Sequence, residues 1–126
     1  MTNHANREPL EECCGLLAGR DGIVQRAFTA VNVAADPGKK YEIAPNELFR
    51  LFREIRADGL ELMGIYHSHP NGTIEPSSTD IERAYYSDAA YFILSPRAPT
   101  LIRAFSIRDG QVNELKIEVV GGAICT

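Results

Sequence analysis

The chain has 126 residues, of which 44% are hydrophobic and 24% charged, as in an average soluble globular protein. This length supports one domain with a real core and is too short for two ordinary domains, so we expect a single domain over residues 1–126. Thirteen basic and 17 acidic residues give a net charge of −4, which argues against a general nucleic-acid-binding protein, because such a protein needs a basic face.

Neither a membrane anchor nor a disulfide framework is visible in the sequence. No run approaches the roughly 18 apolar residues of a membrane span, and the first ten residues lack the apolar centre of a signal peptide. Two of the three cysteines, Cys13 and Cys14, are adjacent, which is not typical of a disulfide scaffold. We therefore expect a cytoplasmic protein that does not associate with membranes.

Turn-forming dipeptides divide the first part of the chain. Residues 14–18 have the composition of a small apolar strand, and Asp21-Gly22 predicts a hairpin that leads into a second strand over 23–32. Residues 34–40 contain Pro and Gly and favour a loop. Residues 41–43 have the composition of a further short strand.

The middle of the chain contains the clearest helix. Pro45 suits its first turn and Gly59 suits its exit. The residues between them carry an apolar stripe at helical spacing: Leu48, Phe49, Leu51, Phe52 and Ile55. A strand over 61–68, a loop over 69–76 and a short helix that begins at Ser77 or Ser78 and runs to about Tyr86 follow.

Three more strands complete the predicted order, over residues 90–94, 101–107 and 111–119. Asp109-Gly110 predicts a hairpin between the last two. Gly121-Gly122 disfavours strand, so we expect residues 119–126 to be a flexible tail. The order indicates an α/β domain with a mixed, mostly antiparallel β-sheet flanked by helices.

Two histidines, His67 and His69, end the strand over 61–68. Side chains at i and i+2 of a strand point to the same face and their Cα atoms lie about 6.6 Å apart, so both rings can converge on one ion. Asp80 follows eleven residues after His69, and a loop of that length can bring its carboxylate to the same point. Two imidazoles and one carboxylate leave a fourth position for water, which is typical of a catalytic rather than a structural zinc site.

Each of these residues has an ordinary explanation when it is considered alone. A His-x-His pair is usually a surface feature, Asp80 suits the first turn of a helix, and Ser77 suits an N-cap. The combination is more specific: His67-Ser68-His69, then seven residues, then Ser77-x-x-Asp80, with an acidic residue upstream at the start of the first strand.

That combination resembles the signature of the JAMM (MPN-plus) metallopeptidase family, an upstream Glu followed by His-x-His-x7-Ser-x-x-Asp. The early family segment Glu-x-Cys-Gly-Leu-Leu-x-Gly is matched from Glu12 to Gly19, and the order of segments agrees from about Glu11 to Val119. Because the chain lacks the insertions of members that act on ubiquitin chains, it resembles the compact prokaryotic form. The resemblance implies the cytidine-deaminase-like JAMM fold.

The resemblance also implies a role for each signature residue. His67, His69 and Asp80 would bind one zinc ion per chain. Glu12 would act as the general base toward the attacking water and pass the proton to the leaving amine. Ser77 would hydrogen-bond the oxyanion or that water. Glu11 is the rival for the base, but Glu12 stands two residues before Cys14-Gly15, which is the family spacing.

The implied reaction is hydrolysis of the amide bond after the C-terminal Gly-Gly of a ubiquitin-like sulfur-carrier protein, by a monomer or a homodimer. One alternative is an MPN-type module that binds a ubiquitin-like partner without cleaving it, and another is a relative that has lost the metal. The intact set of five signature residues favours the enzyme. A small-molecule hydrolase such as a deaminase is a third interpretation. Those sites usually pair a His or Cys with a Cys-x-x-Cys motif, which this chain lacks.

Overall fold

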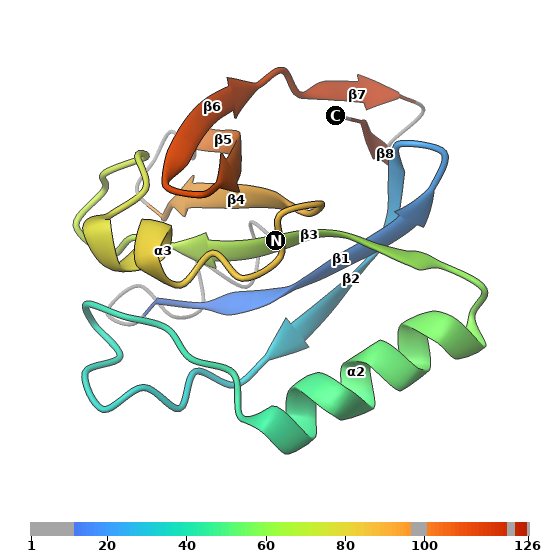
Figure 1. Cartoon of the computed structure of the whole chain (residues 1–126), viewed down its shortest axis with the longest axis horizontal. Coiled ribbons are helices and arrows are strands. Elements are labelled where there is room, and N and C mark those ends of the chain that lie inside the picture. The colour runs from blue at the N-terminus through green and yellow to red at the C-terminus, as the bar shows by residue number, and fades with distance from the viewer. Residues whose placement is uncertain (1–11, 97–100, 121–122, 126) are drawn as a thin grey trace.

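One mixed β-sheet organises the described part of the chain, which comprises residues 12–96, 101–120 and 123–125 of the computed structural model (Figure 1). Within these residues, eight strands lie in the order β6-β5-β4-β3-β1-β2-β8-β7. The elements in chain order are β1 (Cys14–Arg20), β2 (Ile23–Ala30), α2 (Pro45–Ala57), β3 (Glu61–Ser68), α3 (Ser78–Glu82), β4 (Ala90–Ser95), β5 (Leu101–Arg108), β6 (Gln111–Leu115), β7 (Glu118–Val120) and β8 (Ala123–Cys125).

Neighbouring strands pair antiparallel with one exception, since β3 and β4 run parallel. The predicted mixed, mostly antiparallel sheet is therefore confirmed. Both Asp-Gly turns also form the expected hairpins: Asp21 and Gly22 have φ of 53° and 77°, and Asp109 and Gly110 have φ of 49° and 77°. Positive φ at both central residues is the type I′ geometry that matches the twist of the flanking strands.

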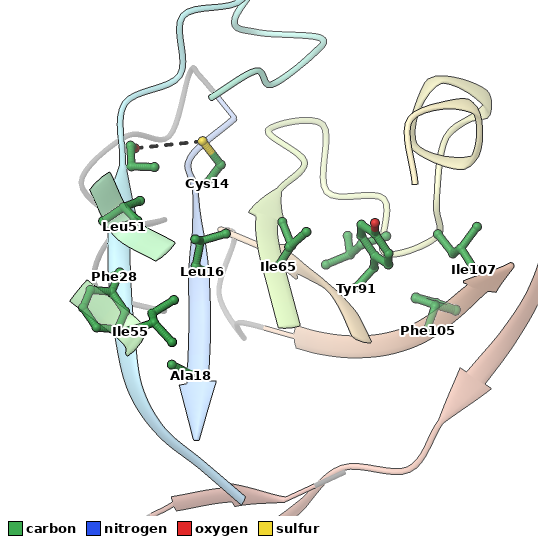
Figure 2. Packing of buried hydrophobic residues seen from close by; sticks show 12 residues of the cluster. Cys14, Leu16, Ala18, Phe28, Leu51, Ile55, Ile65, Tyr91, Phe105 and Ile107 are labelled. Atoms are coloured by element: carbon green, nitrogen blue, oxygen red, sulfur yellow. Dashed lines mark hydrogen bonds between the residues drawn. The ribbon is translucent and has the colours of Figure 1, made fainter. Parts of the chain in front are cut away.

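Helix α2 covers one face of the sheet. Pro45 occupies its first turn, as predicted, and Leu51 and Ile55 are buried on its inner side. Figure 2 shows these two side chains beside Leu16 and Phe28 of the neighbouring strands. Each fully buried aliphatic side chain contributes about 1.5–3 kcal/mol, so this contact is a main source of stability.

A second apolar cluster forms on the opposite face. Side chains alternate along β1, so that Leu16 faces α2 whereas Leu17 packs with Tyr66 and Phe92 on the other side. Gly15 lies in this central part of the sheet, where a Cβ atom would collide with the carbonyl oxygen of Phe28 and the ring of Tyr66. The central strands are thus buried on both faces, which explains their continuous apolar runs.

Two local predictions are wrong. Residues 41–43 do not form a strand, because the backbone of Glu42 is used elsewhere: its N–H donates to the Asn32 side chain and its carbonyl accepts from Val33 N. The second helix ends at Glu82 rather than near Tyr86. The amide of Tyr86 donates to the hydroxyl of Tyr91 at 3.0 Å instead of to a helical carbonyl.

The C-terminal end also differs from the expected strand over 111–119 and free tail over 119–126. Two short strands follow β6, and β8 pairs with β2 through Ile23↔Cys125 and Val24↔Ile124. The outer edge of β2 offers unpaired backbone groups, which a short strand can satisfy. A single domain over residues 1–126 stays a prediction. Neither α-helix of the described residues has the length and apolarity that crossing a membrane requires.

Candidate metal centre

The pairing of β1 with β3 brings the predicted site residues together. Cys14 lies opposite His67, so Glu12, two residues earlier, lies beside the end of β3. His67 belongs to β3, and His69 follows it with its backbone N–H donating to the carbonyl of Leu94 in β4 at 3.0 Å. Asp80, in the first turn of α3, completes a buried cluster with Glu12 and the two histidines.

Three ligand atoms in this cluster form a nearly equilateral triangle. Nε2 of His67 lies 3.1 Å from Nε2 of His69 and 3.1 Å from Oδ2 of Asp80. The distance from Nε2 of His69 to the same oxygen is 3.0 Å. Atoms bonded to one tetrahedral zinc at about 2.0–2.1 Å stand roughly 3.3 Å apart, so the triangle has nearly the dimensions that one ion requires.

The tautomer of His69 makes this triangle a site for a cation. Nδ1 of His69 lies 3.1 Å from the carbonyl oxygen of Thr73 and must donate to it, because a carbonyl only accepts. In the neutral ring Nε2 is then an acceptor, and it faces the Asp80 carboxylate, which is also an acceptor. Such a contact is repulsive unless a proton or a metal ion lies between the atoms. Nε2 of His69 and Oδ2 of Asp80 are therefore placed as two ligands of one metal ion would be.

Glu12 extends the cluster to four groups. One ligand atom from each of Glu12, His67, His69 and Asp80 can be chosen so that all four lie within 4.8 Å of one another. Glu12 is only 4% exposed, and its Oε1 has no hydrogen-bond partner. A buried carboxylate oxygen without a partner is costly, so its presence here indicates a functional demand.

Burial and charge separate the pKa values of the two carboxylates. Burial raises the pKa of Glu12 from 4.5 to about 7, although the charge of His69 opposes this. Burial also raises the pKa of Asp80, but hydrogen bonding with the histidines in their protonated forms outweighs burial and holds that pKa well below its usual range. Asp80 is thus an anion under all ordinary conditions, whereas Glu12 can exchange a proton near neutrality.

The two histidines differ in the same way. Burial dominates at His67 and lowers its pKa. At His69 burial also lowers the pKa, but hydrogen bonding to Asp80 and the nearby carboxylate charges outweigh it, so that the pKa is raised. The fully buried ring of His67 also stacks on Tyr41, with centroids 4.5 Å apart. This stacking fixes the plane of the ring that presents Nε2 to the cluster.

Ser77 is the N-cap of α3 and orients Asp80. Its Oγ accepts from Asp80 N at 3.1 Å, and its own backbone N–H donates to Oδ2 of Asp80 at 2.8 Å. The two residues form a reciprocal capping box. Ser77 also lines an open hollow with Glu12 and His69, which we call the polar cleft; its other lining residues are Gly38, Lys39, Pro70, Asn71, Thr73, Glu75 and Pro76.

Two supporting residues were missed by the sequence reasoning. Ser68 exchanges two hydrogen bonds with the backbone of Cys13, each 3.0 Å long, which fixes the register of Glu12 beside the histidines. Asn32 donates to the carbonyl of Glu12 at 2.9 Å. Ser68 lies within the motif and its place between the two histidines was a usable signal, whereas nothing in the local pattern marks Asn32. The rival base Glu11 lies outside the described residues.

Comparison with known proteins agrees with the geometry of this site. The profile of the Prok-JAB family, described as prokaryotic homologs of the JAB domain, matches residues 1–108. The chain belongs to this family. The resemblance to JAMM metallopeptidases that the sequence motifs predicted is thereby confirmed.

Several relatives of this JAB-family chain are known. It is 41% identical to the desampylase of Haloferax volcanii over 91 residues, which cover 71% of this chain but 66% of that protein. It is 34% identical over 125 residues to the CysO-cysteine peptidase of Mycobacterium tuberculosis, covering 95% of this chain and 84% of the relative. The probable TtuB-protein conjugate cleaving protease of Thermus thermophilus is 36% identical over 108 residues, or 86% of this chain and 70% of that one.

The fold is also found among solved structures. The solution structure of a protein from Desulfitobacterium hafniense has a TM-score of 0.82 and 30% sequence identity to this JAB-family chain. The match covers 92% of this chain and 83% of that structure. The predicted fold class is therefore confirmed by both the coordinates and this likeness.

Proposed function

We propose that the chain is a zinc-dependent peptidase that hydrolyses the amide bond after the C-terminal Gly-Gly of a ubiquitin-like sulfur-carrier protein. The observation that carries this proposal is the convergence of three potential ligand atoms, from His67, His69 and Asp80, beside a buried Glu12 oxygen that has no partner. The similarity to a desampylase and to a CysO-cysteine peptidase supports a conjugate of a ubiquitin-like protein as the substrate. The cytoplasmic location stays a prediction.

In this proposal His67, His69 and Asp80 hold the zinc ion. When bound, zinc acidifies a water molecule and polarises the scissile carbonyl. Asp80 is kept anionic by its low pKa, and the Thr73 carbonyl keeps the Nδ1 proton on His69, so that Nε2 is free to ligate. Such outer hydrogen bonds orient ligands and set their tautomers.

Glu12 is the proposed general base. It takes a proton from the attacking water, whose oxygen bonds to the carbonyl carbon of the terminal glycine, and it delivers that proton to the amine nitrogen as the C–N bond breaks. A pKa of about 7 for Glu12 suits both steps, because the carboxylate then accepts and releases a proton near neutral pH. Ser77, exposed at the polar cleft, hydrogen-bonds the developing oxyanion.

A second hollow next to Asp80 supports binding of a protein tail. Four of its lining residues are polar or charged, namely Glu42, Thr79, Asp80 and Arg83, and the others are apolar or aromatic. A Gly-Gly tail has no side chains of its own, so this hollow is suited to an apolar side chain that precedes the two glycines. The apolar and aromatic lining residues are Leu16, Tyr41, Ile43, Leu48, Ile65, Tyr85, Tyr86 and Tyr91.

The test is a zinc-loaded hydrolysis assay on a ubiquitin-like protein extended beyond its Gly-Gly, followed by mass spectrometry. Glu12→Gln should retain zinc but lose roughly 10²–10⁴ in turnover. Glu82→Gln, which changes an exposed carboxylate in α3, is the matched control and should be fully active. Full activity of Glu12→Gln would refute the assigned base, and binding without cleavage by the wild type would favour the non-catalytic binding module.

A further inference from the structure

We propose that Lys39 binds the free C-terminal carboxylate of the residue that is released, so that the enzyme is an exopeptidase acting on chains that end in Gly-Gly-X. This inference rests on the proposed function and narrows its substrate class. It separates a substrate in which one amino acid follows Gly-Gly from one in which Gly-Gly is joined to a lysine side chain of another protein.

Lys39 lines the polar cleft together with Glu12, His69 and Ser77. It is the only lysine or arginine among the described residues of this lining, and its exposed ammonium group pairs with no carboxylate of the described chain. The acidic residues of this lining are Glu12 and Glu75. The carboxylates of Glu12 and Glu75 repel a ligand carboxylate, and Lys39 is the basic side chain of this lining that can offset the repulsion away from the metal position.

Hydrogen bonds fix the loop that carries Lys39 to the strand that carries Glu12. The N–H of Glu12 donates to the carbonyl of Pro37 at 2.7 Å. The side-chain amide of Asn32 donates to the carbonyls of Glu12 and Lys40, both at 2.9 Å, and to that of Pro37 at 3.3 Å. The backbone of Lys39 therefore lies between the carbonyl groups of Pro37 and Lys40, which both accept from Asn32. The same amide holds the carbonyl of Glu12, so the loop is fixed relative to the proposed base.

Figure 1 shows the same arrangement at the level of the chain. The long connection between β2 and α2 runs past the start of β1 at the end of the sheet where α3 also lies. The backbone N–H groups of Lys39 and Lys40 both donate to the carbonyl of Asp36 at 3.0 Å, which closes a turn at this point. The loop is thus anchored on both sides of Lys39.

The direction of proton transfer decides which part of the substrate lies near Lys39. Glu12 delivers its proton to the leaving amine, so the departing residue extends into the cleft that Glu12 lines. One residue spans only about 3.5 Å, and its carboxylate therefore remains inside the cleft. If the leaving group were a lysine side chain, its apolar four-carbon stem would lie at this place. The ammonium group of Lys39 makes no favourable interaction with such a stem.

The experiment compares two synthetic peptides that both end in Gly-Gly-Ala, one with a free C-terminal carboxylate and one with a C-terminal amide. The zinc-loaded wild type should show a KM about tenfold lower for the free acid, and this preference should shrink as salt is added. Lys39→Met should abolish the preference by raising KM for the acid alone, and Lys39→Arg should retain most of it. Lys40→Met, which alters a neighbouring exposed side chain outside the cleft lining, is the matched control.

Each outcome of this comparison has one meaning. Loss of the acid preference in Lys39→Met but not in Lys40→Met supports the inference. Equal cleavage of both peptides by the wild type, or faster cleavage of a Gly-Gly unit linked to a lysine side chain with no effect of Lys39→Met, overturns it and leaves the proposed function in place. Cleavage of neither these peptides nor the Gly-Gly-extended ubiquitin-like protein by the zinc-loaded wild type overturns the proposed function, and this inference with it.

Discussion

Substituting glutamine for Glu12 should make the metal-free protein more stable at alkaline pH, because the substitution removes a carboxyl group whose ionisation the fold opposes. The unfolded carboxyl ionises around pH 4.5, whereas burial raises the folded pKa to about 7. Between these values the unfolded state has lost a proton that the folded state still holds. Rising pH therefore favours the unfolded state, and the free energy of unfolding falls across this window.

The size of the effect follows from the two pKa values. A pKa difference of one unit corresponds to 1.36 kcal/mol, so the rise from 4.5 to about 7 corresponds to about 3 kcal/mol of stability lost between pH 4.5 and pH 8. Glu12 is almost fully buried, so solvent screening reduces this figure little. The histidines of the cluster also titrate in this range, and the charges of His69 and Glu12 act on each other, so the difference between the variant and the wild type includes this coupling.

Urea unfolding in the presence of a chelator measures this difference. At pH 4.5 the wild type and Glu12→Gln should differ by less than about 1 kcal/mol, and at pH 8 the variant should be more stable by about 3 kcal/mol. Glu82→Gln provides the control for the loss of one exposed negative charge and should follow the wild type at both pH values. Parallel stability curves for the wild type and Glu12→Gln would show that the fold does not oppose this ionisation, and would refute the reasoning.

Three further substitutions probe the site and its support. Asp80→Ala should lose bound zinc and stay folded, while Asp88→Ala, at an exposed position, should keep it; metal analysis showing full zinc in Asp80→Ala would contradict the ligand assignment. Asn32→Ala should lower the free energy of unfolding by about 2–3 kcal/mol, since it removes hydrogen bonds to several backbone groups, and an unchanged urea midpoint would argue against that role. Gly15→Ala should lower the free energy of unfolding by about 1–3 kcal/mol through overpacking. An unchanged melting temperature would show that the neighbouring residues can shift to accommodate the added methyl group.

The sequence predicted those parts of the fold and site that depend on local chemistry. Both Asp-Gly turns require positive φ, which few other residues tolerate, and they form hairpins as expected. Pro45 begins α2 because its fixed φ suits the first helical turn. The approach of His67, His69 and Asp80 was predictable because strand alternation and a helix cap determine where such side chains point.

Interactions between distant segments could not be predicted in the same way. The strand expected at residues 41–43 does not form because the N–H of Glu42 donates to the side chain of Asn32. A hydrogen bond of this kind leaves no periodic pattern in the sequence. The placement of Lys39 in the same cleft lining as Glu12 depends on the Asn32 side chain as well. The early end of α3 depends on the hydroxyl of Tyr91, which comes from the next strand.

The parallel pairing of β3 with β4 has a consequence for how enzymes of this family can change. Parallel neighbours cannot be joined by a tight turn, so the chain needs a long crossover between them, and residues 69–89 make that crossover while carrying His69, Ser77 and Asp80. These proposed site residues therefore occupy a segment that the topology already demands. Since each doubling of loop length costs only about 0.6 kcal/mol, the stretch from Pro70 to Pro76 can lengthen while the sheet stays intact. New substrate preferences should arise first as insertions in this crossover, with the strands beneath it left unaltered.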